Sequence, residues 1–247
     1  MCSIFGFVAS PRGSLDLSVV RAVVAANIRR GPHAFGFAWL DGRGRLRSYR
    51  QVGRLTDELP VLRMVADARL LIGHLRWATQ GDPGANINNH PHPCDGGWLV
   101  HNGIVTNYDE LLAGHRGLPV SSECDSELIG ALAEASPRRT LAGRLRWSVD
   151  RVAGPLAVLG LWSRPGVLAV ARRGNPLHWS ADADGTYLAT LAEGLPGSPR
   201  AVADGRLTIL RPRGGATEAT HYDLAGPPAA ARFAAFDREG GGLYRGG

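Results

Sequence analysis

Short apolar runs bounded by turn residues are the feature that most constrains how this chain folds. Runs typical of buried or half-buried strands cover residues 3–9, 34–40, 45–53, 69–75, 98–103, 155–162, 167–173, 186–190 and 206–211. Helices are predicted over 15–30, near 57–67, and over 107–114, 122–135 and 138–151. Strands towards both ends, with helices grouped between them, favour a layered α+β sheet sandwich over an alternating βαβ series.

The predicted helix over 15–30 has a clear start and end. Ser14 is placed to cap its first turn, and Gly31-Pro32 stops it. One face would carry its apolar residues, namely Leu15, Val19, Ala22, Val23 and Ala26.

The charge of the chain invites a nucleic-acid interpretation that its composition argues against. The formal net charge is +6, but all 28 basic residues are Arg and they are scattered among Ala, Gly and Pro. No basic cluster or RNA-binding aromatic motif is present, so we expect no nucleic-acid partner. The absence of Lys also excludes Schiff-base chemistry and a phosphate-loop lysine.

Cysteine usage and hydropathy indicate the compartment. Cys2, Cys94 and Cys124 form an odd set without paired spacing, which fits a reducing environment better than a disulfide framework. No apolar stretch is long enough to span a membrane, and the N-terminus lacks the pattern of a signal peptide. We therefore expect a cytoplasmic protein without a membrane partner.

Cys2 is the first candidate catalytic residue. Removal of Met1 would give one residue both a thiol and a free α-amino group, and an α-amine titrates near pH 7.7–8.0, where it can accept the thiol proton. The alternative is an inert, processed N-terminal cysteine, because a single cysteine carries little information.

Several separated motifs favour the catalytic interpretation of Cys2. MCSIFGF at the start, GHLRWATQG at 73–81, NNHPHP at 88–93, VHNGIVTNYDEL at 100–111, SSECDSELI at 121–129 and ARRGNPL at 171–177 follow one another in register. In order and spacing they resemble the class II glutamine amidotransferases, in particular the glutaminase domain of glucosamine-6-phosphate synthase. The resemblance covers residues 2–211 and implies a four-layer αββα sandwich of the N-terminal-nucleophile hydrolase type.

The resemblance also implies roles for individual residues. Cys2 would attack the glutamine carboxamide and form a γ-glutamyl thioester, with no metal or organic cofactor. Asn102 and Gly103 match the oxyanion-hole pair, which stabilises the tetrahedral intermediate. An Asn-Gly dipeptide is also common in tight turns, and we expect this pair to occupy such a turn as well.

Two charged residues match the groups that recognise the ends of free glutamine. Arg76 matches the arginine that binds the α-carboxylate, for which a guanidinium fork is suited, and Asp125 matches the acid that pairs with the α-ammonium. Trp77 and Thr79 match residues that line the same site. The alternatives are a surface Arg and an acidic residue in the first turn of the helix over 122–135, stabilised by the helix dipole.

A histidine-rich segment raises the question of a metal. His74, His90, His92 and His101 occur with Cys94, but no CxxC or HExxH spacing is present and the resemblance explains the HPH motif without an ion, so we expect no metal. We interpret Cys124 as structural.

The chain departs from the family pattern at three positions. Ser3 stands where Gly is common, Gln80 where synthases often have His, and His33 where many members have Asp. None of these departures removes a catalytic group. The Gly, Pro and Asn content of residues 76–97 predicts a loop with few rigid contacts.

The domain prediction places the glutaminase domain at 2–211, followed by a C-terminal strand or weakly ordered tail at 212–247. The sequence therefore predicts a glutaminase that either works alone or delivers ammonia to a separate synthase subunit. Two alternatives remain: an N-terminal-nucleophile hydrolase of another γ-glutamyl amide, and a catalytically weak glutamine-binding regulatory module.

Overall fold

Two antiparallel sheets form the centre of the protein in a computed structural model, which describes residues 2–55, 60–213 and 216–225. The first sheet has the order β11-β9-β10-β1-β4-β2-β3. Its strands are β1 (Ser3–Ala9), β2 (Ala34–Asp41), β3 (Leu46–Val52), β4 (Ala68–Arg76), β9 (His178–Ala181), β10 (Gly185–Ala189) and β11 (Arg200–Ala201).

The second sheet has the order β13-β12-β8-β7-β6-β5. Its strands are β5 (His92–Cys94), β6 (Gly97–Gly103), β7 (Leu156–Trp162), β8 (Val167–Arg173), β12 (Arg206–Arg213) and β13 (Ala216–Asp223). The α-helices are α1 (Leu17–Asn27), α2 (Tyr108–Gly114), α3 (Glu127–Ala135) and α4 (Leu141–Val149). Three short 3-10 helices are η1 (Ile28–Arg30), η2 (Pro60–Val65) and η3 (Asn86–Asn88).

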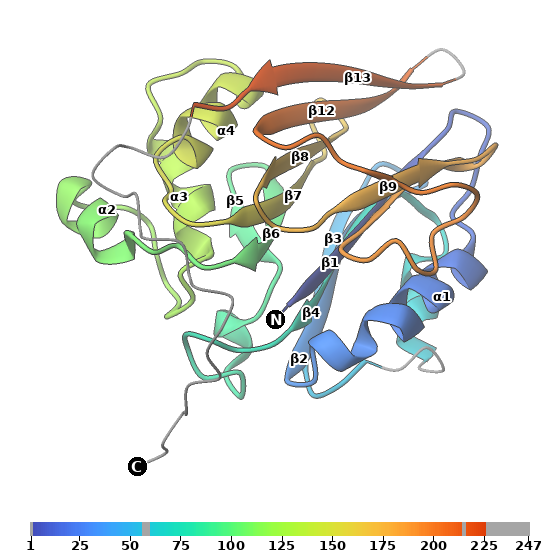
Figure 1. The fold of residues 1–247 in the computed structure, drawn as a ribbon, viewed down its shortest axis with the longest axis horizontal. Coiled ribbons are helices and arrows are strands. Elements are labelled where there is room, and N and C mark those ends of the chain that lie inside the picture. The colour runs from blue at the N-terminus through green and yellow to red at the C-terminus, as the bar shows by residue number, and fades with distance from the viewer. Residues whose placement is uncertain (1, 56–59, 214–215, 226–247) are drawn as a thin grey trace.

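Three apolar clusters hold these elements together in four layers. One cluster joins α1 and η2 to the first sheet, through residues such as Val23 and Phe37. A second joins α3 and α4 to the second sheet, through residues such as Leu132 and Val158. The third lies between the sheets and includes Ile4, which makes the architecture the expected αββα sandwich (Figure 1).

The first strand determines where Cys2 lies. Every residue of β1 is buried, and β1 pairs with β4 on one side and β10 on the other, so it is an inner strand. Ser3 pairs with Leu75, which places Cys2 beside the end of β4 and the segment that follows it. Because an inner strand is fixed by ladders on both edges, the residue before it is held firmly.

Two helix predictions require correction. Helix α1 begins at Leu17, and its N-cap is the side chain of Asp16, which accepts a hydrogen bond from the Ser18 N–H at 2.7 Å. Ser14 is therefore not the capping residue. The buried face is also shifted from the predicted one. It is formed by Val20, Val23, Val24 and Asn27, whereas Ala22 is exposed.

The second correction concerns the helix predicted over 122–135. Helix α3 begins only at Glu127, so Asp125 lies in the turn before it and is not a first-turn residue. The carboxylate of Glu127 accepts hydrogen bonds from the backbone N–H groups of Ser121 and Ser122 and from the Ser121 hydroxyl. These bonds hold the preceding segment in a non-helical path, which is why local propensity misplaced the start.

The remaining strand predictions agree with the structure within a few residues, but short strands were missed. β5, β9 and β11 have two to four residues each, too few for a period to be visible. β13 extends the second sheet past residue 211 by pairing with β12. The division into 2–211 and 212–247 stays a prediction, and residues 57–59 and 226–247 lie outside the described residues. Within the described part of the chain, no helix is long and apolar enough to cross a membrane.

Candidate active site

Cys2 lies at the entrance to β1, half-buried, against the segment that leaves β4. The Trp77 N–H donates to its Sγ at 3.3 Å, and the thiol in turn lies 3.2 Å from the Trp77 carbonyl oxygen. Burial raises the pKa of the thiol, while the Trp77 N–H and the charge of Arg76 lower it and the charge of Asp125 raises it. Because the net direction is upward, the thiol needs a nearby base to become a nucleophile.

Arg76 ends β4 and is buried, with an exposed fraction of 2%. Its guanidinium donates to Asn89 Oδ1 at 2.6 Å, and to the carbonyl oxygens of Gln80 at 2.6 Å and Gly81 at 2.9 Å. Nη2 makes two of these three bonds and Nη1 makes the third, so groups of the loop already occupy part of the guanidinium that the resemblance assigns to a carboxylate. The carboxylate-binding role stays a prediction.

The loop over 76–97 is better held than its composition predicts. Besides the bonds to Arg76, Asn89 Nδ2 donates to the Pro83 carbonyl oxygen at 2.9 Å, and Asn88 Nδ2 donates to Glu123 Oε2 at 3.0 Å. Asn88 Oδ1 accepts from the Glu123 N–H at 2.9 Å. The prediction of few rigid contacts was wrong, because asparagine amides replace the backbone ladder that the loop lacks.

Asp125 contributes a second buried charge, with an exposed fraction of 3%. Its Oδ2 accepts from the Val105 N–H at 2.7 Å and its Oδ1 accepts from the Ser126 hydroxyl at 3.2 Å. Neither Asp125 nor Arg76 takes part in an ion pair within the described residues, yet the charges of both act on the Cys2 thiol. Two opposite buried charges thus lie near the thiol without neutralising each other.

Asn102 and Gly103 end β6 and are paired with Ala157 and Leu156 of β7, so the tight turn expected for them is not present. Position 103 requires glycine because there is no room for a side chain. A Cβ at this position would lie 2.4 Å from His101 Nε2 and 2.4 Å from the Pro155 carbonyl oxygen. The backbone of Gly103 therefore lies too close to its neighbours for any side chain to be added without a shift.

Asn175 is a supporting residue that the sequence did not single out. Its Nδ2 donates to the Asn102 carbonyl oxygen at 2.7 Å and, more weakly, to the Pro155 carbonyl oxygen at 3.3 Å. It lies in the ARRGNPL motif, which was used for the resemblance but not for a role. Only the path of the chain after β8 brings it to the end of β6.

The three departures from the family pattern have structural explanations. His33 Nδ1 accepts from the Ala78 N–H at 3.0 Å and its ring packs against Trp77, so His33 positions the segment that contacts Cys2. The Ser3 hydroxyl donates to Asn27 Oδ1 at the end of α1. Gln80 acts through its backbone oxygen, which any residue supplies.

Trp77 and Thr79 are exposed beside the site, and Trp77 has an exposed fraction of 43%. Trp77 contacts Cys2 through its backbone, whereas Thr79 lies at the surface of the same loop. Both side chains are open to solvent, so a ligand can reach them.

Four buried histidines, His74, His90, His92 and His101, lie close to the charges of Arg76 and Asp125. His74 and His90 are stacked with ring centroids 3.9 Å apart, and His90 meets His92 edge-on at 4.6 Å. Burial lowers the pKa of His74 and His90 well below the ordinary value, that of His92 to about 3 and that of His101 to about 4, so the rings are neutral near pH 7.

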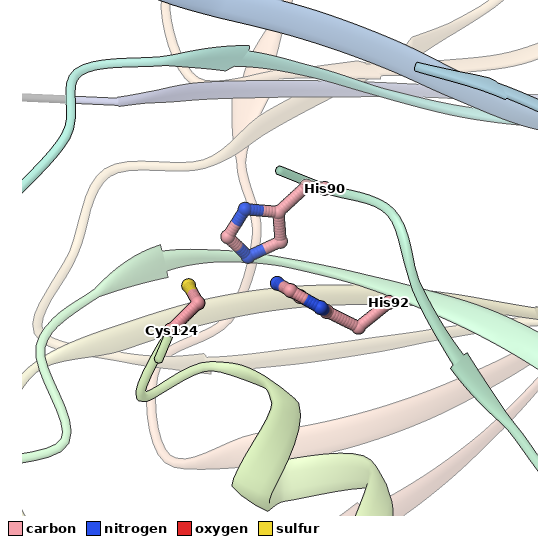
Figure 2. Close-up of side chains that lie close together, drawn as sticks. All are labelled: His90, His92 and Cys124. Carbon is pink, nitrogen blue, oxygen red and sulfur yellow. The ribbon is translucent and has the colours of Figure 1, made fainter. Parts of the chain in front are cut away.

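Several nitrogens of these rings have no hydrogen-bond partner among the described residues. They are His74 Nδ1, both nitrogens of His90, both of His92, and His101 Nε2. An unsatisfied buried polar atom costs about 1–3 kcal/mol, so a group of them requires an explanation. The only described residues with metal-ligand geometry are found here: His90, His92 and Cys124 offer ligand atoms within 4.8 Å of one another (Figure 2).

Comparison with known proteins finds glutamine–fructose-6-phosphate aminotransferases among the sequence relatives, although no family model matches the chain. It is 32% identical over 243 residues to the glutamine–fructose-6-phosphate aminotransferase of Leifsonia xyli, a match that covers 92% of this chain and 38% of the relative. The enzyme of the same name from Streptomyces coelicolor is 36% identical over 187 residues, covering 72% of this chain and 29% of the relative. The chain thus spans well under half the length of these curated relatives.

Solved structures show the same fold. The glutamine phosphoribosylpyrophosphate amidotransferase of B. subtilis is 20% identical with a TM-score of 0.74, over 91% of this chain and 49% of that one. A glutamine aminotransferase class-II domain protein from Silicibacter pomeroyi is 18% identical with a TM-score of 0.57, over 91% of this chain and 100% of that one. The structural likeness shows the fold alone, and the sequence relatives show the family. The chain therefore belongs to the class II glutamine amidotransferases, enzymes with the fold of the N-terminal-nucleophile hydrolases.

Proposed function

We propose that this chain hydrolyses glutamine to glutamate and ammonia, with Cys2 as nucleophile once Met1 is removed, and that the ammonia passes to a synthase domain or a separate synthase subunit. The observation that carries the proposal is the pair of buried, mutually unpaired charges of Arg76 and Asp125 beside the Cys2 thiol. A buried charge without a counter-charge is costly, so such a pair favours a ligand that brings both opposite charges. A free α-amino acid has both.

The roles that the resemblance implies give the following reaction. The α-amine of Cys2 takes the thiol proton, and the thiolate attacks the carboxamide carbon of glutamine. Asn102, through its side-chain amide, and Gly103, through its N–H, stabilise the oxygen that becomes negative in the tetrahedral intermediate. The C–N bond then breaks, and ammonia leaves with a proton returned by the α-ammonium.

Water completes the cycle by attacking the γ-glutamyl thioester, which releases glutamate and restores the thiol. Trp77 N–H supports this cycle because it already donates to Sγ and stabilises the thiolate. Arg76 and Asp125 hold the amino-acid end of the substrate, with Trp77 and Thr79 at the mouth. No step requires a metal or an organic cofactor.

Glutamine and an ammonia-accepting synthase are the partners that this proposal names. Its relatives are named glutamine–fructose-6-phosphate aminotransferases, so glutamine appears in their names as a reactant, and the present chain spans only part of them. The acceptor of the ammonia is therefore sought in another domain or another chain.

The test uses the full chain with a C-terminal tag, after intact mass has shown that Met1 is removed. We expect glutamate and ammonia in equal amounts from glutamine, and a γ-glutamyl adduct on Cys2 when the reaction is quenched. Cys2→Ala and a retained N-terminal extension should each abolish hydrolysis while the circular dichroism spectrum stays the same. Cys94→Ser is the matched control, because burial raises the pKa of the Cys94 thiol to about 12 and leaves it unreactive.

Two results would contradict the proposal. Full activity in the protein with a blocked N-terminus would exclude the α-amine as base. Rapid hydrolysis of other γ-glutamyl amides, with slow hydrolysis of glutamine, would favour the alternative hydrolase.

A further inference from the structure

His90, His92 and Cys124 converge from two separate parts of the chain. His90 and His92 lie just before and within β5, whereas Cys124 lies in the segment that leads into α3. Figure 2 shows the two rings and the thiol turned towards one another. All three residues are buried, with exposed fractions of 2–3%.

The three donor atoms are close enough to share one ion after a small movement. They lie within 4.8 Å of one another, so a common centre exists at most about 2.8 Å from each. Zinc bonds measure about 2.0–2.1 Å to imidazole nitrogen and about 2.3 Å to thiolate sulphur. Each donor therefore has to move inward by less than about 1 Å, which side-chain rotation supplies.

The local chemistry favours such an ion. Both ring nitrogens of His90 and of His92 have no partner among the described residues, so an ion would give one nitrogen of each ring a partner. The Cys124 thiol has only a long contact, 3.9 Å, to Asp125 Oδ1, so its proton can be displaced without loss of a strong hydrogen bond.

We propose that His90, His92 and Cys124 bind one divalent cation with affinity for thiolate and imidazole, for which zinc is the best match. Two nitrogens and one sulphur form a borderline-soft donor set that disfavours magnesium and calcium, which prefer oxygen. The sequence analysis considered a metal for the histidines together with Cys94 and expected none. The structure instead brings Cys124 to His90 and His92, and these ligands come from two segments that fit no short spacing pattern. The fourth position is open to water or another light-atom donor.

The position of the ion indicates a supporting role. Cys124 directly precedes Asp125, so an ion would tie the segment that carries Asp125 to the segment that leads into β5. It takes no part in the hydrolytic cycle. Metal occupancy and glutamine hydrolysis are therefore separate properties, and each can fail without the other.

The experiment uses the full chain without a polyhistidine tag and with Cys2→Ala, which removes the half-buried Cys2 thiol as an alternative metal ligand. The protein is treated with a chelator, dialysed against Zn²⁺ or Co²⁺ under reducing conditions, and separated from free ion. We expect one ion per chain and, with Co²⁺, a thiolate-to-cobalt charge-transfer band in the near ultraviolet.

Three further variants locate the ion. Cys124→Ser and His92→Gln should each weaken zinc binding by at least about tenfold, and Cys124→Ser should lose the charge-transfer band. Cys94→Ser, which changes the other cysteine of the same region, should keep both properties.

Two outcomes would overturn the proposal. One is a folded parent protein that binds no ion or shows no charge-transfer band. The other is an unchanged band in folded Cys124→Ser. Should Cys124→Ser fail to fold, zinc-edge X-ray absorption of the parent decides: sulphur and imidazole scattering supports the site, and oxygen scattering alone refutes it.

Discussion

Gly103→Ala tests the proposed oxyanion hole through a single added methyl group. The new Cβ would lie 2.4 Å from His101 Nε2 and 2.4 Å from the Pro155 carbonyl oxygen. Ordinary non-bonded contacts begin near 3.5 Å, so the Gly103 backbone has to shift by about 1 Å. One of the two obstacles is itself backbone, which leaves little scope for a side chain to yield.

The shift should act on the chemical step. A misplacement of about 1 Å costs about 10²-fold in rate, and loss of an oxyanion donor costs about 10²–10³-fold, or about 2.7–4 kcal/mol. The oxyanion exists only after attack, so kcat should fall by this factor while KM for glutamine changes little. Overpacking should also lower stability by about 1–3 kcal/mol.

The assay follows glutamate release across a range of glutamine concentrations, with a thermal melt of each protein. Gly114→Ala is the matched control, because a Cβ at Gly114 at the end of α2 would meet no atom within 4 Å. A folded Gly103→Ala protein with kcat within about threefold of the parent would refute the assignment of the Gly103 N–H.

Three further predictions follow from neighbouring contacts. Arg76→Ala should raise KM for glutamine about 10- to 100-fold while Cys2 still reacts with an uncharged alkylating agent; an unchanged KM would contradict the carboxylate role. Asn175→Ala, which removes the bond to the Asn102 carbonyl oxygen, should lower kcat by about tenfold with KM within about twofold; equal changes in both would point to substrate binding instead. Burial lowers the pKa of His101 from 6.5 to about 4, so the unfolded state binds protons more readily and stability falls as pH drops below 6.5. From pH 7.5 to 5.5, urea unfolding with chelator present should show about 1 kcal/mol more loss of unfolding free energy in the parent than in His101→Asn, and equal losses would exclude this cause.

Local patterns were sufficient for most strands, whereas the candidate site residues came from the motif resemblance. Apolar runs predicted β1, β4, β6 and β7 because a strand that is buried on both faces is apolar at most of its positions. The position of Cys2 at the tip of β1 follows from the same pattern. The roles of Arg76 and Asp125 came from motif resemblance and stay proposals, although their burial is what those roles require.

Helix starts were less predictable from the sequence. Asp16 replaced Ser14 as the cap of α1, and α3 began five residues later than expected, at Glu127 instead of residue 122. Alternative N-cap residues differ by about 1 kcal/mol in their contribution to helix stability. A hydrogen bond with another segment, such as those from the serines to Glu127, therefore decides at which of several neighbouring residues the helix begins.

By itself the sequence determined the layered α+β architecture, the strand that presents Cys2, and the family. Only the tertiary structure decided that Trp77 reaches Sγ through its N–H, that loop carbonyls occupy part of the Arg76 fork, and that Cys124 meets His90 and His92. The physical reason is the separation along the chain of the residues that each interaction joins. Strand and helix preferences arise from neighbours along the chain, whereas hydrogen bonds and metal sites need atoms placed to within about 1 Å by packing between distant segments.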